Sequence, residues 1–184
     1  MRYKAVLFDL DGTLLDTAPD IITACNHTLE KYGYRKVDEK ILRTKVTAGM
    51  RQMLKLGVPE EKQKSSGIET YMRDEFASYY KDNICLHTRA FSGIPELIEA
   101  LSENSIKSAV ITNKYYDMAK KVLSKFPFAD NFSLILGCDS LTHSKPHPEP
   151  ILKALKLLNV APSEALYVGD HLNDIKAAAA AECD

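Results

Sequence analysis

Two aspartates separated by one residue follow a short apolar segment near the start of the chain. Asp9 comes directly after the apolar residues 5–8, and Asp11 lies two positions further on. In extended backbone, side chains two residues apart point to the same side, so these carboxylates would lie close together. Two carboxylates at that distance resist joint ionisation unless a cation lies beside them. The pair therefore indicates a divalent-cation site, and ligands that are all oxygen favour Mg²⁺ over Zn²⁺.

The same aspartates also have an ordinary structural interpretation. Asp11 and Gly12 are common turn residues, and a turn is expected where a strand ends. A calcium-binding EF-hand loop is excluded, because it needs a preceding helix and a glycine at a different position. Asp9 and Asp11, taken alone, leave both the turn and the cation site open.

Polar residues also follow two later apolar segments. Thr112 and Asn113 end one of them, and Asp170 follows another, with Asp174 one helical turn further on. Ligands of open parallel sheets bind at the carboxyl ends of the strands, so these side chains should converge on one crevice with the first pair. Each has an alternative: a strand-to-helix connection for Thr112 and Asn113, and helix capping for Asp174.

A lysine precedes a segment rich in proline. Lys145 is followed by Pro-His-Pro-Glu-Pro at 146–150. Prolines fix φ, and we expect the segment to be extended and to hold the ammonium beside the crevice, where it would neutralise a phosphate. The alternative is a solvated lysine ahead of a helix. His147 is interpreted as a loop residue.

Apolar periodicity defines the elements that must position these residues. Outside positions 17–83 it predicts strands alternating with helices, which implies a parallel sheet with right-handed crossovers. The expected strands are 3–8, 106–112, 132–136 and 165–168, and the expected helices are 92–104, 116–125, 148–158 and 174–181.

The segment 17–83 shows only helical periodicity. Helices are expected near 17–33, 38–42 and 50–57, followed by a long amphipathic helix from about Pro59. The fold class is therefore α/β, a Rossmann-like parallel sheet with flanking helices and an inserted all-helical domain. The domains are a core of residues 1–16 and 84–184 and the helical insertion of residues 17–83, which the resemblance described below implies is a cap.

Composition excludes several classes of protein. The 184 residues carry 24 Lys and Arg against 25 Asp and Glu, so no basic field attracts nucleic acid. The N-terminal apolar run is too short for a signal peptide or a membrane span. The four cysteines form no close pair, which is typical of reduced thiols in a cytoplasmic protein. The sequence is compatible with a monomer or a homodimer.

Four motifs occur in an order that resembles the haloacid dehalogenase-like (HAD) superfamily. They are DLDGT at 9–13, TN at 112–113, KP at 145–146 and GDHLND at 169–174. The stretches around them are similar to the phosphoglycolate phosphatase branch, and the resemblance covers essentially the whole chain. It implies an HAD-like core with a helical cap that closes over the site.

The resemblance also implies roles for the carboxylates. Asp9 would attack phosphorus and become an aspartyl-phosphate, and Asp11 would act as general acid and then general base. Mg²⁺ would bind Asp9, the main-chain carbonyl of Asp11 and Asp170, with Asp174 acting directly or through a water molecule. Because haloacid dehalogenases lack a residue equivalent to Asp11, its presence favours phosphate chemistry.

The remaining residues implied by the resemblance bind phosphate or select the substrate. Thr112, Asn113 and Lys145 would hold the transferring phosphoryl group. Substrate selection is expected on the cap, near Gly49 and Arg51.

The expected function is that of a Mg²⁺-dependent phosphatase of small phosphorylated metabolites, with 2-phosphoglycolate as the leading substrate. A phosphomutase like beta-phosphoglucomutase and a pyrophosphatase are alternatives on the same frame. A non-catalytic binding protein that retains the fold is an alternative of another class. Relatives usually continue through one more strand, so we expect the chain, which ends at Asp184, to lack that edge strand. His171 replaces the small residue expected after the motif aspartate.

Overall fold

Strands alternate with helices everywhere outside one all-helical segment. The structure, a computed structural model, describes residues 2–184. One compact unit contains the residues up to Asp16 together with Arg89–Asp184, and the other is Thr17–Thr88. We call the first the core unit and the second the helical unit.

The core unit is built on a parallel sheet with the strand order β5-β4-β1-β6. Its strands are β1 (Ala5–Phe8), β4 (Lys107–Ile111), β5 (Leu134–Leu136) and β6 (Ala165–Val168). Strand β1 pairs with β4 on one side and with β6 on the other. All four residues of β1 are buried, which explains why the sequence there is apolar without alternation. The predicted parallel α/β sheet is confirmed.

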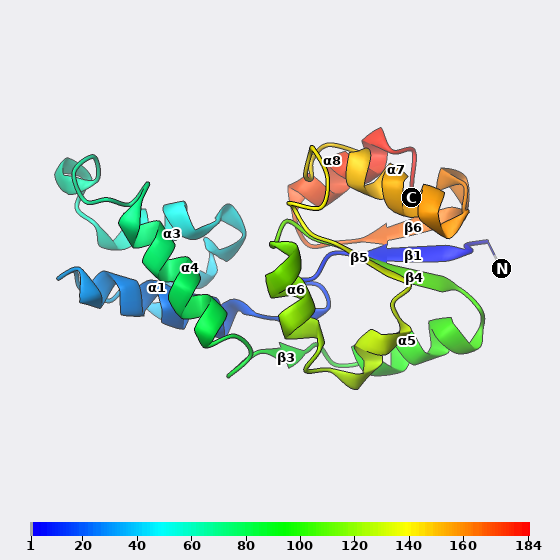
Figure 1. The fold of residues 1–184 in the computed structure, drawn as a ribbon, viewed down its shortest axis with the longest axis horizontal. Helices are drawn as coiled ribbons and strands as arrows, with labels where there is room; N and C mark the ends of the chain where they lie inside the picture. Colours follow the sequence, from blue (N-terminus) through cyan, green and yellow to red (C-terminus); the bar gives the residue numbers. More distant parts are fainter. Residues whose placement is uncertain (1) are drawn as a thin grey trace. The chain divides into compact units, whose positions relative to one another are not determined.

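Helices cover both faces of this sheet (Figure 1). They are α5 (Ile94–Glu103), α6 (Tyr116–Leu123), α7 (Glu149–Leu158) and α8 (Leu172–Ala180). Apolar side chains of α7 and α8 form one buried cluster with inward residues of the strands, including Leu7 and Ile111. Helices α5 and α6 lie on the opposite face.

The chain adds strands first on one side of β1 and then on the other. From β1 the chain moves outward through β4 to β5, and it then returns to β6 on the other side of β1. In open α/β sheets, ligands bind at the carboxyl ends of the strands beside such a switch point. The loops after β1, β4 and β6 are therefore the ones that build the site.

Two short connections flank the helical unit, and the sequence reading did not predict either of them. Within the core unit, β2 (Leu15–Asp16) pairs antiparallel with β3 (Arg89–Ala90). Within the helical unit, the buried carboxylate of Asp20 accepts hydrogen bonds from the main-chain N–H groups of His87 and Thr88 and from the Thr88 hydroxyl. The helical unit consequently extends past the expected boundary at 83.

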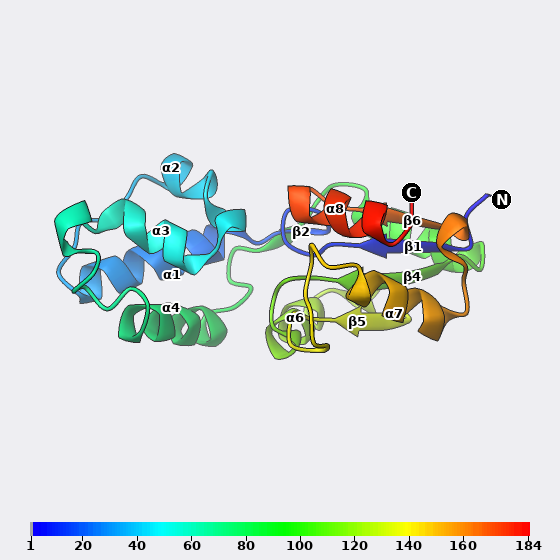
Figure 2. The same ribbon diagram turned by 90° about the horizontal axis from the view of Figure 1, so that it is seen from above.

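The helical unit contains four α-helices and short 3₁₀ turns (Figure 2). The helices are α1 (Ala18–Lys31), α2 (Glu39–Arg43), α3 (Met50–Gly57) and α4 (Tyr71–Asp82). Helices α1 and α4 meet through the stacked rings of His27 and Tyr79, whose centroids are 3.8 Å apart. Among residues 2–184, no helix combines the length and the apolar character needed to cross a membrane.

The long helix expected from about Pro59 begins only at Tyr71. The preceding residues form a 3₁₀ turn at Glu60–Lys62 and further turns. The side-chain amide of Gln63 donates to the carbonyls of Lys55 and Val58, at the end of α3. This amide holds the segment against the end of α3, so it does not continue as a helix.

The last residues of the chain lie against the outer edge of β6. The main-chain N–H of Tyr167 donates to the carbonyl of Asp184, 2.7 Å away, and the Cys183 thiol donates to the carbonyl of Ala165. In the described part of the chain, the parallel sheet has the four strands given above and no fifth strand.

Candidate active site

The loop after β1 brings the first and last motifs together. The N–H of Asp9 donates to the carbonyl of Val168, which carries the pairing of β1 and β6 past the strand ends. Gly12 has a φ of +85°, and a Cβ there would lie 2.3 Å from Asp170 Oδ2. Only glycine therefore allows the Asp170 carboxylate to approach this turn, where it accepts a hydrogen bond from the Thr13 hydroxyl at 3.3 Å.

A second glycine makes room for Asp174. A Cβ on Gly169 would lie 2.5 Å from the Asp174 carboxylate, which is 2% exposed as a residue. Asp174 Oδ2 accepts from the His171 N–H at 3.0 Å, and His171 Nδ1 accepts from the Asn173 N–H at 3.2 Å. His171 is therefore the N-cap of α8. Capping accounts for only one oxygen of Asp174, because the other faces Lys145.

Lys145 lies on a tight turn, so the prediction that the segment 146–150 is extended is wrong. The His147 N–H donates to the Ser144 carbonyl, and the Lys145–Pro146 peptide bond is cis. Pro148, two residues after Pro146, has helical φ and ψ and directly precedes α7. Proline is favoured at a helix start as well as in extended chain, and here the helix start determines the conformation.

The turn carries the ammonium of Lys145 into the core unit. Its side chain is 2% exposed, and Nζ lies 2.9 Å from Asp9 Oδ1 and 2.6 Å from Asp174 Oδ1. The Asn113 side-chain amide donates to the Lys145 carbonyl at 2.9 Å and so holds the turn in place. The amide of Asn113 thus positions Lys145, and its predicted role in binding phosphate stays a prediction.

Three carboxylates gather at this edge of the sheet, and two of them, Asp9 and Asp174, contact Lys145. Oxygens of Asp9, Asp170 and Asp174 all lie within 4.8 Å of one another. Lys145 offsets one of the three negative charges, and the remainder is the charge that one divalent cation neutralises. A ligand set made only of oxygen fits Mg²⁺. The predicted metal ligands are thus brought together, except that the Asp11 carboxylate is not in this group.

Burial is the main influence on the titration of Asp9. It raises the pKa of the carboxyl to about 6, while the Lys145 ammonium opposes the rise and the nearby Asp174 and Asp11 charges add to it. Asp9 is therefore largely ionised at neutral pH. An ionised carboxylate that is poorly solvated and oriented by the Leu10 N–H, 2.7 Å from Oδ1, is a competent nucleophile.

Tyr167 completes the surroundings of Lys145, and the sequence reading missed it. Its hydroxyl oxygen accepts from Lys145 Nζ at 2.8 Å and lies 2.9 Å from the Ile111 carbonyl, to which it donates. Burial, together with the Asp9 and Asp174 charges, raises the pKa of Tyr167 far above its usual range, so the hydroxyl stays neutral. The only signal in the sequence was a hydroxyl-bearing residue within a buried apolar strand.

Asp11 has a different partner. Lys114 Nζ lies 2.9 and 3.0 Å from the two oxygens of the Asp11 carboxylate, and the lysine side chain is 6% exposed. The sequence reading assigned no role to Lys114, which directly follows Thr112 and Asn113. A buried ammonium that contacts both oxygens fixes the orientation of the carboxylate.

Thr112 and the two predicted cap residues occupy distinct surroundings. Thr112 is buried at the end of β4, and its Oγ1 accepts from the Lys114 N–H at 3.1 Å, so the hydroxyl still has its own proton to donate. Gly49 and Arg51 belong to the helical unit, where Gly49 precedes α3 and Arg51 Nε lies 2.6 Å from Glu69 Oε2. Their role in substrate selection stays a prediction.

The fold and the site together define an α/β enzyme whose acidic centre, with a lysine inside it, lies at the switch point of a parallel sheet. The family model "Haloacid dehalogenase-like hydrolase" matches residues 6–184. The chain belongs to this family, and the family predicted from the motifs is confirmed.

Named relatives are phosphatases. N-acetylmuramic acid 6-phosphate phosphatase of Pseudomonas putida is 36% identical over 176 residues, which cover 96% of this chain and 78% of that protein. Phosphoglycolate phosphatase of Aquifex aeolicus is 36% identical over 174 residues, which cover 95% of this chain and 79% of that protein. These names support the phosphoric monoester hydrolase that the motifs predict.

A solved structure confirms the fold. The crystal structure of a predicted phosphoglycolate phosphatase from Haemophilus somnus superimposes with a TM-score of 0.86 at 31% identity. The match covers 100% of this chain and 84% of that one. The fold class predicted from the sequence is thus shared with a protein of the same family.

Proposed function

We propose that this protein is a Mg²⁺-dependent phosphatase of small phosphorylated metabolites that acts through an aspartyl-phosphate on Asp9. The observation that carries the proposal is the position of Lys145, whose ammonium contacts both Asp9 and Asp174, the two carboxylates that gather with Asp170. A buried cation next to a nucleophilic carboxylate neutralises the anionic substrate as the two approach each other.

The reaction begins with attack of an Asp9 oxygen on phosphorus. The new bond from carboxylate to phosphorus forms as the bond from phosphorus to the substrate oxygen breaks, and Asp11 gives a proton to the departing alcohol. Asp11 makes this transfer from its protonated form, which the second half of the reaction restores, and Lys114 holds the Asp11 side chain in position. Thr112 donates its hydroxyl proton to an oxygen of the transferring group, and Lys145 neutralises another.

The second half of the reaction releases phosphate and restores the enzyme. Asp11 takes a proton from a water molecule, whose oxygen bonds to phosphorus as the bond from Asp9 to phosphorus breaks. Asp9 returns to its carboxylate form, and Asp11 is protonated for the next cycle. Both halves use the same two side chains in opposite directions.

Asp9, Asp170 and Asp174 would hold Mg²⁺, with the main-chain carbonyl of Asp11 as a further oxygen ligand. When bound, the ion supplies positive charge that stabilises the developing charge on the phosphoryl oxygens. Gly12 and Gly169 support this function indirectly, because Gly12 lets Asp170 approach the loop after β1 and Gly169 leaves room for the Asp174 carboxylate beside the loop after β6.

The two phosphatases named above suggest a substrate class. Phosphoglycolate and N-acetylmuramic acid 6-phosphate are both phosphomonoesters that also carry a carboxylate. We therefore expect a carboxylate-bearing phosphomonoester, with 2-phosphoglycolate as the leading candidate. Gly49 and Arg51, in the helical unit, are the residues we expect to contribute to this choice.

The test is phosphate release across a panel of substrates with and without Mg²⁺. The panel contains 2-phosphoglycolate, N-acetylmuramic acid 6-phosphate, pyrophosphate, a nucleoside monophosphate and a hexose 1-phosphate. We expect Mg²⁺-dependent release that is greatest for the first two and falls on the order of 10³-fold in Asp9→Asn. Isomerised hexose phosphate without free phosphate would indicate a mutase, and activity that survives in Asp9→Asn would overturn the nucleophile.

A further inference from the structure

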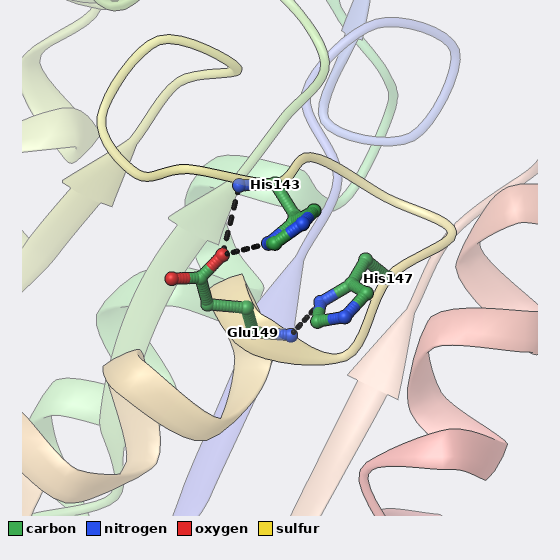
Figure 3. Close-up of side chains that lie close together, drawn as sticks. All are labelled: His143, His147 and Glu149. Atoms are coloured by element: carbon green, nitrogen blue, oxygen red, sulfur yellow. Dashed lines mark hydrogen bonds and ion pairs between the residues drawn. The ribbon is translucent and has the colours of Figure 1, made fainter.

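A second group of metal-ligating side chains lies on the outer side of the turn that carries Lys145. His143, His147 and Glu149 offer ligand atoms that all lie within 4.8 Å of one another. In residues 2–184, it is the only such group besides the carboxylate cluster. Figure 3 shows the two imidazole rings side by side, with the Glu149 carboxylate against His143.

The turn and the start of α7 fix these three residues relative to one another. The turn from Ser144 to His147 brings the two imidazoles together, and their centroids are 4.2 Å apart. Glu149 Oε2 accepts from the His143 main-chain N–H at 2.8 Å. A carboxylate oxygen has more than one lone pair, so this hydrogen bond leaves Glu149 able to bind a cation as well.

The ring nitrogens make contacts that a metal ion would replace. His143 Nδ1 lies 2.8 Å from Glu149 Oε2, and His147 Nδ1 accepts from the Glu149 N–H at 3.2 Å. Ligand atoms around a tetrahedral Zn²⁺ lie about 3.3 Å apart, so His143 and Glu149 need to separate by only about half an ångström. Both histidines are exposed, so their rings can turn without loss of packing, and an ion can enter from solvent.

The ligand chemistry selects a class of ion. Two imidazoles and one carboxylate, with room for water, form the ligand set of open sites for borderline transition-metal ions, whereas Mg²⁺ prefers oxygen ligands. The group also lies beside an open hollow lined by Thr142, Ser144 and Pro146 in addition to the two histidines. Water can therefore complete the coordination.

We propose that His143, His147 and Glu149 form a binding site for a divalent transition-metal ion of the Zn²⁺ type, separate from the Mg²⁺ site that the carboxylates would form. The proposal does not depend on the phosphatase activity. A different explanation is that Glu149 only fastens the loop through His143. That explanation requires no ion and predicts no binding.

Calorimetric titration of the untagged protein with Zn²⁺ in excess Mg²⁺ tests the proposal. We expect one Zn²⁺ per chain, with affinity weakened at least about tenfold in His143→Gln and in His147→Gln. His27→Gln is the matched control, because His27 also lies near a carboxylate, 3.4 Å from Glu75, but beside a tyrosine ring instead of a second imidazole. It should bind Zn²⁺ like the unaltered protein.

Asp170→Asn separates this site from the carboxylate cluster. We expect Zn²⁺ binding at the histidines to persist in Asp170→Asn. Binding that is lost in Asp170→Asn and retained in His147→Gln would overturn the proposal, as would no binding at all.

X-ray absorption at the zinc edge gives a second measurement that does not depend on comparing variants. Ligation by two histidines predicts outer-shell scattering from imidazole rings in the Zn²⁺-loaded protein. A spectrum with oxygen ligands and no imidazole contribution would contradict the site even if the calorimetric stoichiometry agreed.

Discussion

The turn and helix start at 143–149 contribute to two groups of side chains that differ in burial and in chemistry. On the inner side, Lys145 contacts Asp9 and Asp174, which gather with Asp170. On the outer side, His143, His147 and Glu149 contact one another at the surface. In the inner group Asp9 and Asp174 are buried and Asp170 is exposed, whereas the outer group consists of two exposed imidazoles and a half-buried carboxylate.

The difference shows what burial demands of a cation site. Carboxylates removed from water are stable only beside compensating charge, so the inner group has a resident cation, Lys145, which also orients it. The exposed histidines need no such compensation, and hydrogen bonds within the loop are enough to hold them. We therefore expect changes at the inner group to alter both stability and catalysis, and changes at the outer group to alter metal binding alone.

Replacing Lys145 with methionine should give the largest effect. The change leaves Asp9 and Asp174 without their shared cation, so we expect the Mg²⁺-free protein to lose about 3 kcal/mol of unfolding free energy. Phosphate release should fall on the order of 10³-fold. Urea denaturation and a phosphate-release assay measure the two effects.

Lys153→Met is the matched control for that change. Lys153 is an exposed residue of α7, so its replacement should alter stability by less than about 0.5 kcal/mol. If Lys145→Met kept the stability and activity of Lys153→Met, burial would not be what distinguishes the inner group.

A pair of glycine variants tests whether close approach builds the inner group. Gly12 and Gly33 both have positive φ, but a Cβ on Gly12 meets the Asp170 carboxylate, whereas one on Gly33 meets nothing within 4 Å. Gly33→Ala should therefore lose only about 1 kcal/mol of stability. Gly12→Ala should in addition lose about 10²-fold in phosphate release, because Asp170 is displaced. Equal activity in the two variants would show that the position of Asp170 is not critical.

The pKa of Asp9 predicts how Mg²⁺ binding depends on pH. The ion needs the carboxylate form, so the apparent affinity should weaken about tenfold for each pH unit below about 6. Calorimetry between about pH 5 and 8 would measure this dependence. This range extends from about one pH unit below the Asp9 pKa to about two units above it. An affinity that stays constant down to pH 5 would show that Asp9 does not titrate as its burial predicts.

The same shift has a defined sign for stability. The folded Mg²⁺-free protein binds the Asp9 proton more tightly than the unfolded chain does, since the pKa is raised from 3.8 to about 6. The stabilisation from this proton is full below pH 3.8 and is lost as the pH rises through about 6. In Asp9→Asn this contribution to the pH dependence of stability should disappear.

The ion pair of Lys114 with Asp11 provides a further test within the core unit. If Lys114 positions the general acid, Lys114→Met should slow the hydrolysis of alkyl phosphates about tenfold more than that of p-nitrophenyl phosphate, whose leaving group needs no proton. Lys114→Arg, which can still contact both oxygens, should recover part of the difference. An equal loss for both substrates would indicate a structural role only.

Elements with a strong local pattern were predictable from the sequence. The four strands of the parallel sheet and the helices between them follow from apolar periodicity, and Asp38 caps α2 as a helix start signal suggests. Residues 59–70 were predicted wrongly, because the amide of Gln63 binds carbonyls at the end of a different helix. The helix propensity of residues 59–70 gives no information about that contact with another helix.

The part of the site formed by motif residues at strand ends was predictable. The contacts between residues that are far apart in the sequence were not. The gathering of Asp9, Asp170 and Asp174 followed from the rule for strand ends. The contacts of Tyr167 with Lys145 and of Lys114 with Asp11 depend on register between strands and on side-chain length. Asp20 was missed for the same reason, since its partners are near the far end of the helical unit.

Replacing His147 with glutamine should have the smallest effect on catalysis. The imidazole contacts His143 and the Glu149 N–H at the surface, and the buried contacts of the Lys145 side chain involve neither ring. Phosphate release with Mg²⁺ alone should therefore stay within about twofold of the unaltered protein. A larger loss without any Zn²⁺ present would mean that the outer contacts hold Lys145 in place, and the two groups would then be one functional unit instead of two.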